Sequence, residues 1–291
     1  RSRPVKRIAD VRTLRAAQFS EDSGPLAHPV RPSSYREINN FYTATIYEKG
    51  AEIIRMLKTL LGDDLFRKGM DLYLTRCDGT AATVEEFIAC FAECSGQNLD
   101  AFFQWYRQAG TPVVTMSQNY VPAKKRFTLH FRQATPPTPG QNKKEPLVIP
   151  ILYGLIGPSG KIITLDPHST SPNEGLFVLD QEEGSLVFDG VSEKPVPSVL
   201  RNFSAPARLQ SDLDSADNLA LFQYDTDAFN RWQAAQNVAM NMLIETIATM
   251  NANQRVNFDP RFAQTLAKLL ATSEDHAFVA QVLTLPSEND I

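Results

Sequence analysis

Apolar side chains recur three or four positions apart between about residues 36 and 110, which is the spacing of helices that bury one face. The longest stripe predicts a helix from about Thr45 to Gly62, and its apolar positions are Ile46, Ile53, Ile54, Leu57, Leu60 and Leu61. Thr45 and Glu48 have the spacing of a capping box at its start. Gly62 is the expected end, because glycine readily adopts the left-handed conformation that closes many helices.

Three further helices are predicted in the same region. One begins near residue 63 and ends before Gly79, and the next begins at a capping box formed by Thr83 and Glu86. The last spans about residues 99–108 and ends before a Gly-Thr-Pro sequence. The first part of the chain is therefore predicted to be a helical unit.

The pattern changes to a period of two from residue 113 to about residue 205. Phe127, Leu129 and Phe131 alternate with polar side chains, as on a half-buried strand. Further short apolar runs lie at residues 147–156, 162–165, 176–179 and 186–188. Several short strands separated by turn residues favour a β-sandwich over a parallel sheet.

Helical spacing returns after Pro206. The predicted helices cover residues 213–223, 228–250, 261–271 and 275–283. Such a series could begin an α-solenoid, although the sequence shows no clear repeat. The acidic cluster of Asp212, Asp214 and Asp217 is expected to be the solvated start of the first helix. The predicted fold is multidomain α+β: a helical unit, a β-sandwich, and the start of a second helical unit.

Charge and cysteine content narrow the function classes. The chain has 29 Lys and Arg against 33 Asp and Glu, which argues against electrostatic binding of nucleic acid. No apolar run approaches the roughly 20 residues that span a bilayer, so no membrane contact is expected. The three cysteines, Cys77, Cys90 and Cys94, are a poor disulfide framework. Reduced thiols in a cytoplasmic protein fit better.

The motifs of a complete active site are absent. The sequence has no His-Glu-x-x-His, no nucleophile elbow and no phosphate-binding loop. None of its histidines have ligand spacing; they are His28, His130, His168 and His276. Cys90 and Cys94, four apart on one predicted helix, could bind a metal, but core packing is favoured. His28 lies in a proline-bracketed loop and is expected to be structural.

The chain opens on Arg-Ser-Arg-Pro, without an initiator methionine or a signal sequence. This start suggests a fragment or a processed product, although a cloning boundary would look the same.

Residues 39–56, which contain Tyr47-Glu48-Lys49-Gly50-Ala51, resemble the Tyr-Glu-Lys-Gly-Ala segment of the aminopeptidase N family of zinc aminopeptidases. Similar segments occur through the whole chain, at residues 11–15, 18–19, 27–32, 78–83, 105–106, 110–112, 203–206, 231–236 and 283–287. On this series the chain is identified as a member of the bacterial branch. The resemblance implies three domains: the helical half of a thermolysin-like catalytic domain (1–112), a β-sandwich (113–206), and the beginning of an α-helical C-terminal domain (207–291).

The resemblance also implies a site. In the family, two histidines of His-Glu-x-x-His and a downstream glutamate hold Zn²⁺, which activates the attacking water. Those residues would lie upstream of Arg1, so no metal ligand is expected in this chain. Tyr47 matches the tyrosine that donates a hydrogen bond to the oxyanion, and Tyr42 matches an aromatic residue lining the pocket for the N-terminal side chain. Glu48 could shape the site or act as the capping-box acid.

The implied function is removal of N-terminal residues from peptides, as part of peptide catabolism in the cytoplasm. The chain alone is expected to be inactive, and without the upstream half of its catalytic domain it should expose an apolar face on residues 1–110. The alternative is a non-catalytic scaffold or interaction module with the same architecture. An epoxide hydrolase related to these peptidases is disfavoured, because that group lacks the sandwich predicted here.

Overall fold

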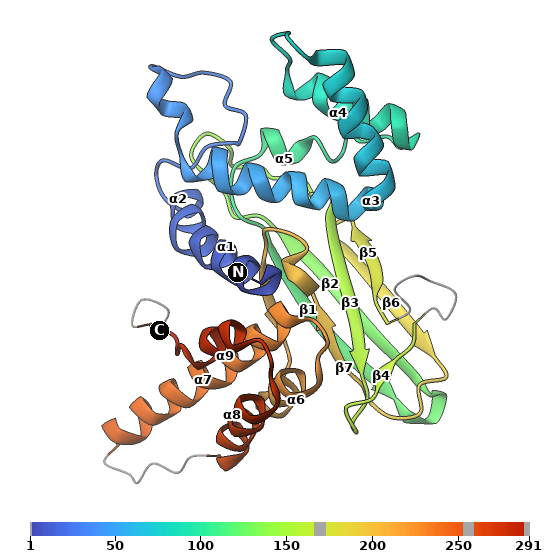
Figure 1. Cartoon of the computed structure of the whole chain (residues 1–291), viewed down its shortest axis with the longest axis vertical. Helices are drawn as coiled ribbons and strands as arrows, with labels where there is room; N and C mark the ends of the chain where they lie inside the picture. The colour runs from blue at the N-terminus through green and yellow to red at the C-terminus, as the bar shows by residue number, and fades with distance from the viewer. Residues whose placement is uncertain (1, 166–172, 253–258, 288–291) are drawn as a thin grey trace.

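The computed structural model describes residues 2–165, 173–252 and 259–287. Helices of the first unit form the top and left of the molecule, two sheets lie at its centre and right, and the C-terminal helices lie at the lower left (Figure 1). The predicted order of a helical unit, a β-sandwich and a second helical unit is confirmed.

The first helices precede the region in which the sequence pattern predicted helices. Helix α1 (Arg3–Thr13) continues through a π-helical turn, η1 (Leu14–Gln18), into α2 (Phe19–Ser23). The buried side chains of α1 are in one cluster with those of α7 and α9. The start of the chain therefore packs on its last helices.

A buried ion pair joins α1 to the long helix α3 (Gly50–Cys77). Arg7 Nη1 and Nη2 lie 2.5 and 2.6 Å from Glu52 Oε1 and Oε2. Arg7 also donates to the carbonyl of Phe203, which precedes the last strand and the C-terminal helices. One guanidinium thus links the first unit, the long helix and the junction with the C-terminal helices.

The start of α3 corrects the predicted capping box. The helical path begins with a π-helical turn, η3 (Thr45–Lys49). Thr45 does not cap it: the Thr45 N–H donates to Glu21 Oε2, and its hydroxyl accepts from Gln18. The preceding Thr43 accepts the N–H of Ile46 instead. The Thr-x-x-Glu spacing was misleading because the helix starts two residues earlier.

Other helix boundaries follow the sequence. Gly62 has φ 78° and ψ 168°, so it interrupts α3 where the first helix was expected to end. Thr83 and Glu86 form the predicted capping box of α4 (Val84–Ser95). The helix predicted at 99–108 was too long, because only α5 (Gln104–Arg107) is helical there. A short 3-10 helix, η2 (Ile38–Phe41), precedes the α3 segment.

Two four-stranded sheets form the sandwich. The first has the order β6-β2-β1-β8, with β1 (Val113–Val121), β2 (Arg126–Ala134), β6 (Glu183–Asp189) and β8 (Arg208–Ser211). The second is built on β3, with β3 (Ile149–Ile156), β4 (Ile162–Ile163), β5 (Gly175–Leu179) and β7 (Val196–Val199). Short 3-10 helices are η4 (Pro122–Lys124) and η5 (Arg201–Phe203). All pairings are antiparallel except β1 with β8.

The sandwich core continues into the first helical unit. Phe127, Leu129 and Phe131 are buried, as their alternation predicted. They share a cluster with buried side chains of α3 and α4. The buried indole of Trp105 donates to the Val148 carbonyl at 2.8 Å, which fixes the end of the helical unit on the sheets.

The C-terminal helices have the predicted positions. They are α6 (Ser215–Tyr224), α7 (Ala228–Asn251), α8 (Pro260–Thr272) and α9 (His276–Leu283). An aspartate caps each one, and Asp214 accepts from the Asp217 N–H as the helix start that was expected. Strand β8 extends beyond the predicted boundary at residue 206, and the three domain boundaries stay a prediction. None of the helices in the described ranges has the length and hydropathy of a membrane span.

Candidate active site

The two tyrosines that the sequence singled out lie side by side at the start of the α3 segment. Tyr42 is 67% exposed and Tyr47 is 57% exposed. Their ring centroids are 6.1 Å apart and the ring planes are inclined by 22°, so the rings stack. The Tyr47 N–H donates to the carbonyl of Thr43 at 3.2 Å. Both phenols therefore project from one ordered turn toward solvent.

His28 and Glu21 hold the N-terminal side of this turn. His28 Nδ1 is 2.8 Å from the Leu26 carbonyl, so that nitrogen carries the proton. The Thr43 hydroxyl lies 2.9 Å from Nε2, to which it can donate, and it accepts the Ile46 N–H. Glu21 accepts the N–H of Thr45 at 3.2 Å. His28 thus has a structural contact in its loop, the role that its position predicted.

Lys49 holds the other side of the turn. Its ammonium is buried and lies 2.8 Å from Asp22 Oδ2, and it donates to the Gly110 carbonyl at 3.0 Å. Asp22 Oδ1 accepts the Gly110 N–H at 2.7 Å, and Oδ2 also accepts the Thr111 hydroxyl at 3.0 Å. This buried group of Asp22, Lys49, Gly110 and Thr111, called the Lys49 anchor below, ties the Tyr47 turn to α2 and to the entrance of β1.

Electrostatics show which interaction dominates in the Lys49 anchor. Burial works to raise the pKa of Asp22, but the Lys49 charge and hydrogen bonds from Lys49, Gly110 and Gln18 outweigh it and hold that pKa below its usual value. Burial lowers the pKa of Lys49, and Asp22 opposes that change. The carboxylate is therefore stabilised in its charged form although solvent does not reach it.

The sequence left two roles open for Glu48, shaping the site or acting as the capping-box acid. The structure excludes the second. The N–H of Thr45, which a capping-box acid would accept, is bonded to Glu21 instead. Glu48 therefore does not cap the helix, and it lies partly buried next to Tyr47 in the same turn.

Several large apolar side chains of the first helical unit are exposed. Leu26, Tyr35 and Ile38 are 79%, 60% and 64% exposed. Tyr42 and Tyr47 add to this exposed apolar surface, and a continuous apolar face on residues 1–110 stays a prediction. Such a face is typical of a surface that another protein segment or a ligand covers.

The described residues supply no metal centre. No group of three or more His, Cys, Asp or Glu side chains within them is placed to hold a metal ion. His28 is engaged as above, His130 contacts Ser185, and His168 lies outside the described residues. The three cysteines are free, and burial raises the pKa of the Cys90 thiol. These residues do not fit a zinc site.

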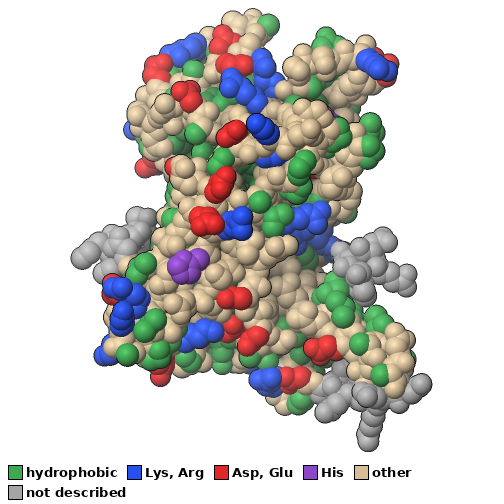
Figure 2. Space-filling view, turned by 180° about the vertical axis from the view of Figure 1, so that it is seen from behind, with side chains coloured by type: hydrophobic (Ala, Val, Ile, Leu, Met, Phe, Trp, Pro, Cys, Tyr) green, Lys and Arg blue, Asp and Glu red, His purple; other side chains and the backbone are tan. Residues whose placement is uncertain are grey.

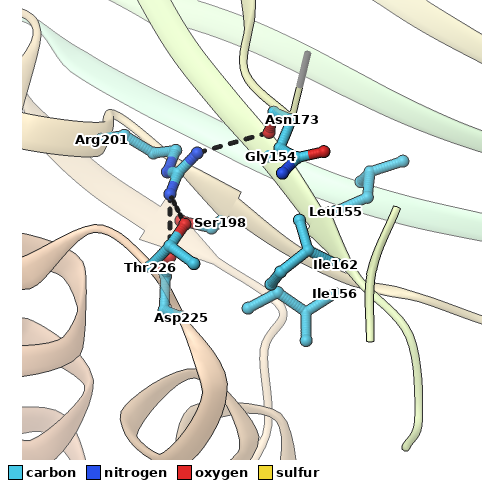
Figure 3. A pocket seen from close by; sticks show the side chains of 9 residues that line it. All are labelled: Gly154, Leu155, Ile156, Ile162, Asn173, Ser198, Arg201, Asp225 and Thr226. Atoms are coloured by element: carbon cyan, nitrogen blue, oxygen red, sulfur yellow. Dashed lines mark hydrogen bonds and ion pairs between the residues drawn. The ribbon is translucent and has the colours of Figure 1, made fainter. Parts of the chain in front are cut away.

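Two hollows lie away from the residues of the Tyr47 turn. In one, between β3, β7 and the start of the C-terminal helices, Arg201 is held by Asp225, Thr226 and the Asn173 carbonyl (Figure 3). Its lining side chains leave no room for a water molecule. The other is a shallow groove of about 590 Å³ along α1, lined by Val5, Lys6, Ala9, Arg12, Thr13, Ala16 and Gln281. Neither includes a residue of the Tyr47 turn.

The surface also shows no concentration of one charge on the face seen in Figure 2. Basic and acidic side chains of the described residues are interspersed there, with apolar side chains between them. This distribution gives no electrostatic reason to place a polyanion on that face.

The sequence pattern missed parts of this site. Asp22 gave no signal, because its partners lie far away in the chain, whereas Thr43 was overlooked as the cap although it accepts an N–H only three residues on. Lys49 did give one: it lies three residues after Ile46 and four before Ile53, on the buried stripe itself. A lysine on such a stripe is rarely buried unless an acid pairs with it.

Three family models match the chain in sequence. Residues 5–106 match the peptidase family M1 domain, residues 110–212 match a domain of unknown function with an Ig-like fold, and residues 215–291 match a domain of unknown function with ARM repeats. The order agrees with the helical unit, the sandwich and the second helical unit seen in the structure.

Individual relatives give the same answer. The chain is 51% identical over its full length to aminopeptidase N of Caulobacter vibrioides and 42% identical to aminopeptidase N of Escherichia coli, and it covers 33% of each. A crystal structure of Legionella pneumophila aminopeptidase A in complex with aspartic acid superposes with a TM-score of 0.77 at 30% identity, covering 94% of this chain and 32% of that one. The chain thus spans about a third of the length of these relatives.

Similarity to aminopeptidases N therefore runs from one end of the chain to the other, and the M1 match contains the Tyr47 turn. The chain belongs to the aminopeptidase N branch of peptidase family M1.

Proposed function

We propose that a longer protein containing this chain is a zinc-dependent aminopeptidase that hydrolyses N-terminal residues from peptides, as part of peptide catabolism in the cytoplasm. The supporting observation is the full-length similarity to aminopeptidases N, joined to an exposed tyrosine on a turn that is fixed from both sides. The proposed domains are 1–112, 113–206 and 207–291, as in the sequence analysis.

Tyr47 is the proposed catalytic residue of this chain. Its phenol donates a hydrogen bond to the oxyanion that forms when the scissile carbonyl becomes tetrahedral. A fixed neutral donor aimed at developing negative charge contributes roughly 3–4 kcal/mol to lowering a barrier. The role requires a group that is accessible and preorganised, and Tyr47 combines 57% exposure with a backbone turn bonded on both sides.

Tyr42 is the proposed substrate-binding residue. Its ring stacks on Tyr47, so it lies next to the reacting carbonyl in the proposed pose. An aromatic face there would contact the side chain of the N-terminal residue of the peptide.

The proposed zinc ligands lie in a part of the protein outside this chain. Zinc bound there would activate the water that attacks the carbonyl. That part is also the proposed partner of the apolar face around Leu26, Tyr35 and Ile38. Because general base and metal are both outside the chain, the 291 residues alone are proposed to be inactive.

Zinc content and hydrolysis of alanyl-p-nitroanilide test this proposal, measured on the isolated chain and on the full-length protein. A zinc-loaded, active full-length protein beside an inert chain is the expected result. A metal-free, inert full-length protein would favour the non-catalytic scaffold, and zinc-dependent hydrolysis by the chain alone would contradict the divided site.

A further inference from the structure

The Lys49 anchor and Tyr47 belong to the same π-helical turn. Two residues apart in a helical turn, side chains project to roughly opposite sides of the axis. The exposure agrees with this, because Tyr47 is 57% exposed while the Lys49 side chain is 1% exposed. Rotation of the turn about its axis would therefore move both side chains together, in opposite directions.

The turn itself needs external support. A π-helical turn is rare and usually occurs as a single insertion in an α-helix, often at functional sites. Here the Thr43 hydroxyl accepts the N–H of Ile46, and the other support of η3 comes from contacts with more distant parts of the fold. Its buried contacts are those of Lys49 with Asp22 and with the Gly110 carbonyl, and that of the Thr45 hydroxyl with Gln18.

The far side of the anchor is rigid. Gly110 has φ +94°, and a Cβ at this position would lie 2.9 Å from Thr135 Cγ2. The carbonyl that accepts from Lys49 is thus held in a conformation that only glycine adopts readily. Asp22 is held in turn by the Gly110 N–H and the Thr111 hydroxyl. The ammonium is therefore bonded to groups that lie outside the η3 turn and are bonded to each other.

We propose that Lys49 is a positioning residue: its buried ammonium, held by Asp22 and the Gly110 carbonyl, fixes the rotation of the η3 turn and thereby the direction of the Tyr47 phenol. This inference rests on the proposed role of Tyr47 and adds to it how the phenol is aimed. The direction of the Tyr47 phenol then also depends on the segment that leads into the sandwich, because Gly110 and Thr111 directly precede β1.

A double-mutant cycle in the full-length protein tests the proposal, with kcat and KM for alanyl-p-nitroanilide as readouts. The anchor is removed by Asp22→Asn together with Lys49→Met, which leaves no buried unpaired charge. This variant is expected to lower kcat roughly 10- to 100-fold while KM stays within about three-fold, since misaimed groups cost rate more than ground-state binding. In a Tyr47→Phe background the same pair of substitutions should change kcat by less than about three-fold.

A matched control separates positioning from general destabilisation. Arg201→Met together with Asp225→Asn removes another buried ion pair, whose side chains are 6% and 1% exposed and line a hollow that includes no residue of the Tyr47 turn. Thermal unfolding of both double variants is recorded. The control is expected to keep wild-type kcat even if its melting temperature falls as much as that of the anchor variant.

A milder variant covers the case in which the anchor variant does not fold. Thr111→Val removes only the hydroxyl bond to Asp22 and is expected to lower kcat about three-fold with zinc content unchanged. Wild-type kcat in the folded anchor variant, or in Thr111→Val where the anchor variant fails to fold, would overturn the proposal. Full additivity with Tyr47→Phe would also overturn it. Wild-type kcat in Tyr47→Phe alone would instead overturn the proposed role of Tyr47.

Discussion

Two buried ion pairs in this chain differ in how completely their polar atoms are satisfied. In the Lys49 anchor, both carboxylate oxygens of Asp22 accept hydrogen bonds from the chain. In the pair of Arg201 with Asp225, Asp225 Oδ2 and Arg201 Nε have no partner among the described residues. The two acids respond in opposite ways: the pKa of Asp22 is held below its usual value, whereas burial raises the pKa of Asp225.

This difference shows that burial alone does not define the role of an ion pair. A carboxylate that is fully bonded stays charged and holds its neighbours in place, while an incompletely bonded one is costly to keep charged. The first kind lies under the Tyr47 turn, where the proposed chemistry needs a fixed phenol. The second lies at the junction with the C-terminal helices, where the hollow admits no water-sized sphere.

Neutralising each acid should give the largest contrast. Asp22→Asn leaves Lys49 charged, buried and without a counter-ion, which is expected to cost about 3–5 kcal/mol of unfolding free energy. Asp225→Asn is expected to cost less than about 1 kcal/mol, because Arg201 keeps Thr226 and Glu174 as partners. Denaturant unfolding of the isolated chain measures both, and equal losses would remove the distinction.

The next contrast concerns two glycines with positive φ. Gly110→Ala is expected to cost about 2–3 kcal/mol, because the left-handed conformation penalises a Cβ and Thr135 lies only 2.9 Å away. Gly190 also has a positive φ, of +78°, but a Cβ there would meet no atom within 4 Å. Gly190→Ala is therefore expected to cost about 1 kcal/mol of unfolding free energy. Unfolding midpoints compare the two, and a larger loss at Gly190 would show that the anchor is not under steric constraint.

A smaller contrast concerns two caps. Thr43→Ala and Thr83→Ala each remove a hydroxyl that accepts a helix N–H, and each should cost about 1 kcal/mol of stability. Only Thr43→Ala is expected to lower kcat of the full-length protein, by a few-fold, since Thr43 precedes the Tyr47 turn. Equal kcat values in the two variants would show that the Thr43 cap does not influence the direction of the Tyr47 phenol.

The last contrast is in the pH dependence of stability. Because the pKa of Asp22 is lower folded than unfolded, its contribution is present above the unfolded value and is lost as pH falls through the folded one. Asp225 has the opposite sign: its pKa is higher folded, so stability is relatively greater at low pH and is lost as pH rises through the folded value. Unfolding free energies of Asp22→Asn and Asp225→Asn against wild type, from pH 3 to pH 7, should therefore diverge in opposite directions.

The architecture could be predicted well from the sequence, because local patterns of apolar spacing and helix capping determine where its helices and strands form. The alternation through Phe127, Leu129 and Phe131 gave β2, and the Thr83–Glu86 spacing gave the start of α4. Prediction from such patterns failed at Thr45, where tertiary bonds from Gln18 and Glu21 replace the local cap, and at residues 99–108, where turns replace most of a helix.

The candidate site was only partly accessible to sequence reasoning. Tyr47 and Tyr42 were found through a resemblance, since periodicity alone would make Tyr47 an ordinary core or surface tyrosine. The anchor beneath them joins residues 22, 49 and 110, and no local pattern connects positions so far apart. Only the lysine on an apolar stripe indicated that a buried acid should be present.

The role of Tyr47 is tested most directly by Tyr47→Phe in the full-length protein, which removes the hydroxyl and keeps the ring that stacks on Tyr42. With zinc content unchanged, kcat for alanyl-p-nitroanilide should fall roughly 10²- to 10³-fold, as for the loss of one oxyanion donor. A kcat within about three-fold of wild type would contradict the assignment of Tyr47 to the oxyanion.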